Sequence, residues 1–385
     1  MTMINTDLTT QLLQQLVQIN SVNPGLDDLG PGEAQVAAWL ADLCRAWGLD
    51  VELQETDRDR PNVIARWRGT GGGRSVLLTG HTDTVSLENM LDDPLDGRIE
   101  DNRLYGRGSY DMKGGLAAIL GAVEALQRAG FQPRGDIILG FVTDEEYLSV
   151  GMDALVKEVQ ADAAILTEPT ELRLCVAHKG FAWVNLTTQG RAAHGSLYHT
   201  GVDAIVHMGR LLNVIERFEH ETALKTQNLL LGRESIHASM ISGGIGLSTY
   251  PDRARLQVEH RLLPGQTGED VLNWWQQQID EIQREDPHFT AEVELEFHRP
   301  GYEIALDAPI VQTVERAATA AMGKEPAIYG MWAWLDSAIL GRAGIPTVII
   351  GPGGEGAHAA VEWVSLDDVF TCARIIADAV QAWTG

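Results

Sequence analysis

The chain contains the stretch Ser75-Val76-Leu77-Leu78-Thr79-Gly80-His81-Thr82-Asp83, in which an apolar run ends in an imidazole and a carboxylate. A short apolar run that is followed by polar residues is typical of a buried strand. In open α/β sheets, ligands bind at the carboxyl ends of the strands. We therefore expect His81 and Asp83 to lie at the edge of a sheet where a ligand or metal can bind.

Two further clusters follow the same pattern. Asp111-Met112-Lys113-Gly114-Gly115 comes shortly after Leu104-Tyr105-Gly106-Arg107-Gly108, and Asp144-Glu145-Glu146 comes directly after the apolar run 137–143. Imidazole and carboxylate groups are ligands that zinc accepts. Of two adjacent glutamates, one can hold a metal while the other moves a proton. The order and spacing of the three clusters predict a metal-dependent hydrolase.

The segments around the clusters alternate between strand and helix patterns. Strands are expected over 51–53, 62–67, 77–80, 136–143 and 163–167, and helices over 8–19, 34–47, 113–128 and 151–159. This alternation predicts an α/β fold, a doubly wound and mostly parallel sheet with helices on both faces.

The pattern changes after His178. Alternating strand patterns over 181–189, 234–241, 254–262 and 291–297 are combined with amphipathic helices over 203–217 and 269–284. This order favours a separate α+β sandwich. The first pattern returns over 310–322, 336–341, 347–351 and 366–383. We expect a first domain built from residues 1–178 and 299–385, with residues 179–298 inserted into it.

Composition narrows the class of protein. The chain has 385 residues, of which 44% are hydrophobic, and a net charge of −25, which disfavours nucleic acids and anionic membranes as partners. It shows no apolar stretch long enough to span a membrane and no secretory signal. Cys44, Cys175 and Cys372 are far apart and in no metal-binding spacing, so we expect reduced thiols and a cytoplasmic protein.

Three more residues join the candidate site. Glu168 follows an expected strand, His194 lies in Arg191-Ala192-Ala193-His194-Gly195, and His358 follows the glycine-rich run 351–357. Each signal is weak alone, since a single histidine near a strand end is more often structural than a ligand. Their combination with the three clusters makes chance a poor explanation.

Taken together, these motifs resemble the zinc-dependent aminoacylase and exopeptidase family that includes acetylornithine deacetylase, succinyl-diaminopimelate desuccinylase, aminoacylase-1 and a glutamate carboxypeptidase. The resemblance covers essentially the whole chain. Beyond the clusters above, it rests on Glu168-Pro169-Thr170, His178-Lys179-Gly180, Arg261-Leu262-Leu263-Pro264-Gly265 and Gly351-Pro352-Gly353. It implies that the inserted two-layer sandwich is a dimerisation domain and that the protein is a homodimer.

The resemblance also implies a metal-ligand set. His81 would bind one zinc and His358 the other, Asp111 would bridge them, and Glu146 and Glu168 would each complete one site. The expected cofactors are two Zn²⁺, for which Co²⁺ or Mn²⁺ can substitute. Two cations at such a spacing share a bridging hydroxide and polarise an amide carbonyl.

Three further roles follow from the same resemblance. Glu145 would be the general base that takes a proton from the metal-bound water. Asp83 would orient the imidazole of His81 as a carboxylate behind the ligand, or it caps a turn. His194 would reach the partner subunit's site and stabilise the oxyanion, or it is a surface histidine of the dimerisation domain.

Substrate contacts are expected from four residues. Arg261 would bind the substrate carboxylate, or it forms an interdomain salt bridge. Gly353 and Gly354 would let the backbone approach the substrate closely. Ser248 stands where the family commonly has a substrate-contacting asparagine.

The chain departs from the family at Ser248, at Tyr147 and in the segment 331–337. These departures lie where a substrate would be selected, so the family's named substrates cannot be carried over. Tyr147, Trp332 and Trp334 suggest an apolar pocket, and they are equally consistent with ordinary core aromatics.

The expected function is hydrolysis, by a two-zinc amidohydrolase, of the amide bond of an N-acyl or N-substituted amino acid with a free carboxylate. A dipeptidase or carboxypeptidase with the same mechanism is the first alternative, and a non-catalytic binding protein on this scaffold is the second. The acyl group, the amino acid, the identity and occupancy of the metals, and any closure of the domains stay open at this point.

Overall fold

The computed structural model describes residues 2–57, 59–222 and 228–385. The chain divides into two compact units, of which the first contains Met1–Val176, Ile304–Tyr329 and Leu335–Gly385, and the second contains Ala177–Glu303 and Gly330–Trp334. The boundaries expected from the sequence were 178 and 298. Gly330–Trp334 groups with the second unit because the Lys179 amide donates to the Met331 carbonyl and the Trp334 indole donates to the Pro300 carbonyl.

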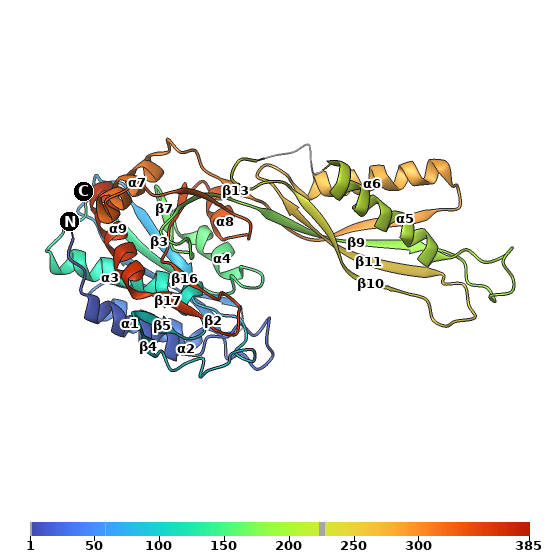
Figure 1. Cartoon of the computed structure of the whole chain (residues 1–385). Helices are drawn as coiled ribbons and strands as arrows, with labels where there is room; N and C mark the ends of the chain where they lie inside the picture. The colour runs from blue at the N-terminus through green and yellow to red at the C-terminus, as the bar shows by residue number, and fades with distance from the viewer. Residues whose placement is uncertain (1, 58, 223–227) are drawn as a thin grey trace. The chain divides into compact units, whose positions relative to one another are not determined.

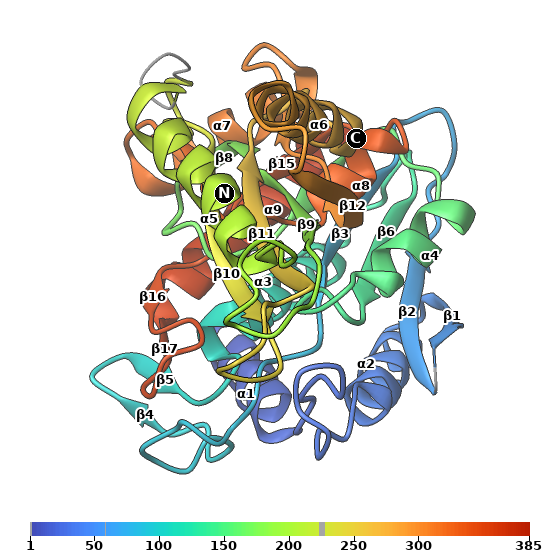
Figure 2. The same ribbon diagram turned by 90° about the vertical axis from the view of Figure 1, so that its right-hand side faces the viewer.

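The first unit is built on a mixed sheet. Its strand order is β1 (Asp50–Asp57), β2 (Arg60–Trp67), β6 (Ile137–Val142), β3 (Val76–His81), β7 (Ala164–Leu166), β15 (Thr347–Ile349) and β8 (Leu174–His178). The run from β6 through β3 and β7 to β15 is parallel, and β2 and β8 pair antiparallel with its two ends. β1 pairs antiparallel with β2. Figure 2 shows β2, β6 and β3 side by side. β14 (Ile328–Met331) also pairs with β8, as does β13 (Tyr302–Glu303) at Ala177 and His178.

Helices cover both faces of this sheet (Figure 1). On one side α3 (Gly114–Arg128) and α9 (Leu366–Thr384) pack against β3 and against each other, with α1 (Thr6–Gln18) on α3 and α7 (Pro309–Met322) on α9. On the other side α4 (Val150–Glu158) contacts α8 (Ser337–Arg342). The helix α2 (Ala34–Ala46) packs on β1 and β2 on the side of α1 and α3, where the Gln127 side chain of α3 donates to the Trp47 carbonyl just beyond α2 (Figure 2). Every residue of β3 and β6 is buried, which explains their continuous apolar sequences. The doubly wound α/β class predicted from the sequence is confirmed.

A small antiparallel sheet of the first unit was not expected from the sequence. It consists of β16 (Gly354–Glu355), β17 (Trp363–Ser365), β5 (Arg103–Tyr105) and β4 (Ile99–Glu100), in that order. A π-helical turn over Ser109–Lys113 leads from β5 into α3. Strands of two or three residues carry no periodic signal, so only the fold reveals that these distant segments are neighbours.

The second unit is a two-layer α+β sandwich. Its antiparallel sheet has the order β10 (Ser235–Gly243), β11 (Arg253–Leu262), β9 (Gly180–Gln189) and β12 (Thr290–Arg299). Both α5 (Ala204–Arg217) and α6 (Gly268–Glu285) lie on one face of this sheet (Figure 1), and a π-helical turn over Phe218–Thr222 follows α5. The core between the layers includes Leu186, Leu211 and Trp275, all buried.

Across the residues that the structure describes, no helix combines the length and hydropathy that a membrane span requires. The three cysteine side chains are buried.

Candidate metal centre and active site

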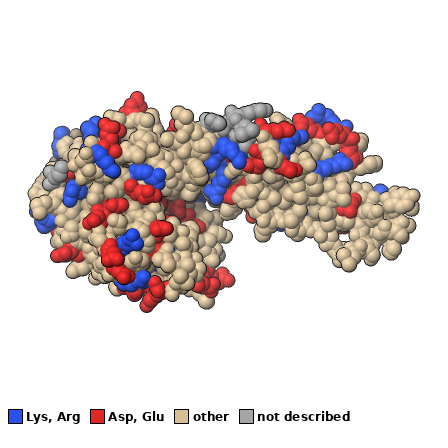
Figure 3. Space-filling view, in the orientation of Figure 1, with Lys and Arg blue, Asp and Glu red and all other residues tan. Residues whose placement is uncertain are grey.

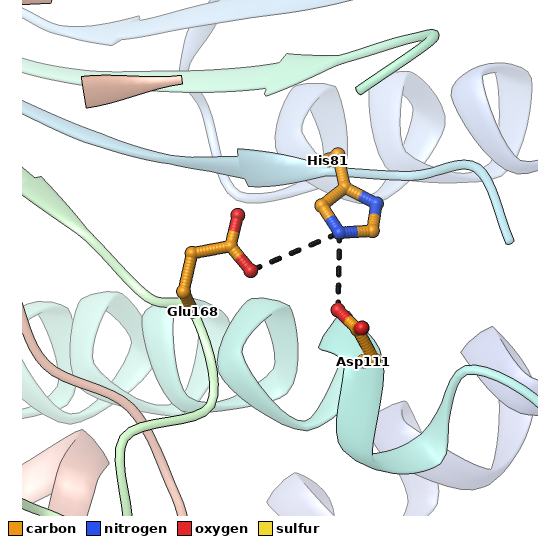
Figure 4. A group of neighbouring side chains, drawn as sticks. All are labelled: His81, Asp111 and Glu168. Carbon is orange, nitrogen blue, oxygen red and sulfur yellow. Dashed lines mark hydrogen bonds and ion pairs between the residues drawn. The ribbon is translucent and has the colours of Figure 1, made fainter. Parts of the chain in front are cut away.

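The first candidate metal group lies where β3 and β7 end. His81 is the last residue of β3, and Glu168 follows shortly after β7, its parallel neighbour. Asp111 comes from the turn before α3. The His81 Nε2 atom lies 3.3 Å from Asp111 Oδ1 and 3.9 Å from Glu168 Oε2. Figure 4 shows both carboxylates pointing toward this nitrogen. These three side chains form what we term the first group.

A second group shares Asp111 with the first. His358 Nε2 lies 3.5 Å from Asp111 Oδ2 and 3.0 Å from Glu146 Oε2. Glu146 comes from the loop after β6, and His358 from the connection between β16 and β17. The two histidines differ in exposure, because the His81 side chain is 1% exposed and that of His358 is 53% exposed.

The donor atoms of both groups fit divalent cations. Within each group the candidate ligand atoms lie within 4.8 Å of one another, and Asp111 has one oxygen beside each histidine. Glu168 Oε1 is buried and has no hydrogen-bond partner among the described residues, so it is available to a cation. Imidazole nitrogen with carboxylate oxygen is a donor set that suits zinc. The five expected ligands are thus brought together as two groups joined by Asp111.

Crowding of carboxylates dominates the electrostatics. Burial raises the pKa of Glu168 well above its usual range, and the charges of Asp111 and Asp336 raise it further. Hydrogen bonds to Asp111 and Glu146 raise the pKa of His358 to about 10. Divalent cations at these positions would offset the negative charge and displace the proton from His358, because metal ions are the largest local charges in such sites.

Glu145 lies beside this cluster. Burial raises the pKa of its carboxyl well above the usual range, and the nearby charge of Glu168 adds to the effect, whereas His81 opposes it. A raised pKa brings a carboxylate closer to the range in which it exchanges protons efficiently near neutral pH. The position and the pKa of Glu145 are thus compatible with a general base.

Asp83 holds the backbone that carries both glutamates. Its Oδ1 and Oδ2 atoms accept hydrogen bonds of 3.1 Å from the Glu145 and Glu146 amides, respectively. His81 Nδ1 lies 3.0 Å from the Asp83 carbonyl oxygen and 3.4 Å from Oδ1. Asp83 therefore makes the contacts of a turn cap and also lies against the imidazole, so the two interpretations left open by the sequence are compatible.

A buried network behind this loop was missed by sequence reasoning. Arg60 donates from Nε and Nη2 to the two Glu33 oxygens, each at 2.7 Å, and its Nη2 lies 2.9 Å from Asp144 Oδ1. The Asn23 amide donates to Asp144 Oδ1 at 3.1 Å and to Asp83 Oδ2 at 2.7 Å. No local pattern signals this network, because its five members come from separate places in the chain.

His194 and Ser248 lie together in the second unit. Gly195 donates to the Ser248 carbonyl at 2.8 Å, and His194 forms an isolated bridge with Thr249. His194 Nδ1 lies 2.8 Å from the Ser196 hydroxyl oxygen, and the Ser196 amide donates to the same nitrogen at 3.3 Å. Both His194 and Ser248 are exposed.

Arg261 also lies in the second unit, on β11. Its Nη2 atom is 2.9 Å from Glu259 Oε1, and its guanidinium carbon is 5.6 Å from the centre of the Phe181 ring. The salt bridge that the structure shows for Arg261 is therefore within this unit, whereas the sequence interpretation considered one between domains.

Gly353 and Gly354 make close contacts within the first unit. A Cβ at Gly353 would lie 2.3 Å from Asp368 Oδ2, and one at Gly354 would lie 2.3 Å from the Trp363 carbonyl oxygen. The close approaches that these glycines permit here are to α9 and β17, so packing alone accounts for the absence of side chains.

The aromatic residues proposed for a pocket differ in their surroundings. Trp332 is 69% exposed and Tyr147 43% exposed. Trp334 packs edge-on against Phe181 and His178 within the second unit. Trp334 therefore has the structural role that the sequence left open for it.

Comparisons with known proteins agree with this geometry. Residues 77–382 match the model of peptidase family M20/M25/M40. An acetylornithine deacetylase of Myxococcus xanthus is 29% identical over 342 residues, which cover 86% of this chain and 87% of that protein.

Among solved structures, the aminopeptidase PepT of Bacillus cereus superposes with a TM-score of 0.83 at 21% identity, covering 99% of this chain and 100% of that one. A dinuclear metal-binding peptidase of the M20 family from Bacillus subtilis superposes with a TM-score of 0.75 at 13% identity, covering 98% of each chain. The resemblance drawn from the sequence motifs is thereby confirmed, and the chain belongs to peptidase family M20/M25/M40.

Proposed function

We propose that the protein is a two-metal amidohydrolase that cleaves the amide bond of an N-acyl or N-substituted amino acid with a free carboxylate. The observation that carries this proposal is the pair of donor groups joined by Asp111, with Glu145 adjacent to the ligand Glu146. The deacetylase relative from Myxococcus xanthus supports the reaction class. We assign zinc to both groups, with cobalt or manganese as substitutes, because each group combines one imidazole nitrogen with two carboxylates.

The side chains have separate tasks in this reaction. When bound, the cations would supply a Lewis acid for the amide carbonyl and lower the pKa of an attacking water. Glu145 accepts the proton of that water and passes it to the leaving nitrogen. Asp83 holds the backbone amides of Glu145 and Glu146, so the base and the neighbouring ligand keep their spacing.

In this proposal the second unit supplies three further contacts, and Gly353 and Gly354 of the first unit supply the others. His194 stabilises the oxyanion in the active site of the partner subunit. Arg261 binds the substrate carboxylate with two N–H donors of its guanidinium group. To do so, it must give up part of its ion pair with Glu259. Ser248 lies beside His194 and contacts the same substrate. Gly353 and Gly354 would provide backbone contacts to the substrate.

A homodimer is part of the same proposal. β10 is an edge strand, and the exposed apolar residues on it and beyond it include Met240, Ile241, Ile245 and Leu247. On the face shown in Figure 3, the end of this unit carries few charged side chains. An apolar edge of this kind is a ready template for pairing with another chain. Sedimentation of Ile241→Lys should show monomers where the unchanged chain shows dimers, and a monomeric unchanged chain would contradict this part.

A dipeptidase or aminopeptidase is the second candidate. The structural similarity to PepT of Bacillus cereus favours it, and the chemistry at the two metal groups would be the same. The candidates differ in whether the substrate carries an acyl or an aminoacyl group on the cleaved nitrogen.

A substrate panel tests the proposal. The protein supplied with Zn²⁺ or Co²⁺ is incubated with N-acetyl, N-succinyl and N-carbamoyl amino acids and with dipeptides. We expect release of free amino acid from one acyl class, whereas turnover of dipeptides alone would establish the second candidate. Glu145→Gln should lower kcat by about 10²- to 10⁴-fold, and Glu158→Gln, a change at an exposed helix end, serves as the control. No hydrolysis of any amide in the panel would reject both candidates.

A further inference from the structure

Strand pairing places the turn that carries Asp111 beside the loop that carries His358. In the small sheet, β5 pairs with β17 so that Leu104 faces Val364 and Tyr105 faces Trp363. Asp111 follows β5 along the chain, and His358 precedes β17. The relative position of these two ligands is therefore set within a compact part of the first unit.

Glu362 holds the backbone of the Asp111 turn. This side chain is 1% exposed, and its Oε1 atom accepts hydrogen bonds from the Tyr110 and Asp111 amides at 3.0 and 3.1 Å. Its Oε2 atom accepts from Arg107 Nη1 at 2.8 Å and from the Gly108 amide at 3.0 Å. Both oxygens are thus committed to the protein, and hydrogen bonds to an ionised carboxylate are the strong ones. Glu362 cannot leave this position without freeing the backbone on which Asp111 depends.

Asn89 connects the same arginine to the His358 loop. Its Oδ1 atom accepts from Arg107 Nη2 at 2.6 Å, and its Nδ2 atom donates to the His358 carbonyl at 2.9 Å. Arg107 Nη2 also donates to the Ala359 carbonyl at 3.2 Å. His358 has a φ of +60°, a left-handed backbone conformation that residues with a side chain rarely adopt. Such a conformation persists where the surroundings hold it, and these hydrogen bonds on the exposed loop do so.

We propose that Arg107, Asn89 and Glu362 form a clamp that positions Asp111 and His358 for metal binding. Glu362 acts through Asp111, which has an oxygen in each metal group, so it controls both groups. Asn89 acts through the backbone of His358, which belongs to the second group alone, so it tunes that group selectively. The inference rests on the proposed two-metal function and concerns positioning residues, since none of the three is itself a proposed ligand.

Titration with Co²⁺ tests the clamp. Calorimetry of the metal-stripped protein should resolve two binding steps, and His358→Ala identifies the step that belongs to the second group. Asn89→Ala should weaken that step by about 3- to 10-fold, the value of one hydrogen bond, and leave the other unchanged. Asn89→Asp keeps the acceptor for Arg107 but loses the donor to His358, so it should weaken the same step. Asn213→Ala, an exposed change on α5 of the second unit, should alter neither step.

Glu362→Gln tests the other end of the clamp. Both steps should weaken by about 10- to 100-fold, the usual effect of removing a partner behind a metal ligand. Thermal unfolding of the metal-free variants shows whether they fold. If Glu362→Gln does not fold, the exposed Asn89 variants still test the clamp.

The outcomes are distinguishable. Failure of the unchanged protein to bind two cobalt ions would reject the two-metal function together with the clamp. Two normal steps in the unchanged protein and in both Asn89 variants would reject the clamp alone, as would an equal weakening of both steps by Asn89→Ala.

Discussion

Replacing Arg60 with methionine should destabilise the first unit strongly. The guanidinium group lies between Glu33 and Asp144, at 2.7 and 2.9 Å, and the side chains of these two carboxylates are 0% and 2% exposed. Methionine fills most of the same volume, so the main change is the loss of the positive charge. Removing one partner of a buried ion pair costs about 3–5 kcal/mol, because the other charge stays buried without compensation.

The loss of stability caused by Arg60→Met should become larger as the pH rises. Burial raises the pKa of Glu33, and the charge of Asp83 raises it further, whereas the hydrogen bond to Arg60 lowers it. Without Arg60 the pKa of Glu33 in the folded state rises further, so the folded protein keeps a proton that the unfolded chain releases above about pH 4.3. The free energy of unfolding of the variant therefore falls as pH rises, by up to about 1.4 kcal/mol per pH unit, relative to the unchanged protein.

Urea unfolding at about pH 5 and about pH 7.5 measures this dependence. The difference between Arg60→Met and the unchanged protein should be larger at the higher pH, and the double variant Glu33→Gln, Arg60→Met should recover part of it. Arg68→Met is a suitable control, because Arg68 is 60% exposed in its pairs with Asp50 and Asp136 and such pairs contribute about 0–1 kcal/mol. A cost below about 1 kcal/mol for Arg60→Met, or an equal cost at both pH values, would refute the reasoning.

Two further predictions concern packing and acid stability. Gly115→Ala should cost about 1–3 kcal/mol, measured by urea unfolding, because its Cβ would lie 2.1 Å from the Thr167 carbonyl oxygen. Gly209→Ala on α5, where an added Cβ meets none of the described atoms within 4 Å, should instead stabilise by about 1 kcal/mol, and a similar loss in both variants would contradict the packing argument. Burial lowers the pKa of His260 to about 3, while its Nε2 accepts a hydrogen bond from the Trp275 indole. The unfolded chain takes up a proton on this histidine below about pH 6.5, and the folded state does not. Protonation of the unfolded chain should therefore lower the free energy of unfolding by about 2 kcal/mol at about pH 5. The free energy of unfolding of His260→Gln should fall correspondingly less between neutral pH and about pH 5.

Much of the fold could be predicted because its signals are local. The apolar runs of β3 and β6 and the helical spacing of α3 and α9 are visible in short windows of the sequence. Polar residues at strand ends indicated the site, since parallel strands bring their carboxyl ends to one edge. His81 and Glu168 were found in this way, and the resemblance to a known family supplied the assignments that strand ends alone could not make.

The parts that were missed depend on contacts between distant segments. The short strands β5 and β17 have too few residues for a periodic pattern, and their pairing joins positions far apart in the chain. Arg60, Asn89 and Glu362 lack a local signature for the same reason, because their partners become neighbours only in the folded chain. These three residues are therefore visible in the structure and not in the motifs, whereas Asp83, two residues after His81, was indicated by its motif.

The count of metal ions bound by Asp111→Ala tests the central claim most directly. Equilibrium dialysis against Zn²⁺ should find two ions per chain in the unchanged protein, one for each donor group. The Asp111 oxygens lie 3.3 Å from His81 Nε2 and 3.5 Å from His358 Nε2, so the variant should lose affinity for both ions. Two ions bound with unchanged affinity by Asp111→Ala, or the loss of only one, would contradict a centre joined by this carboxylate.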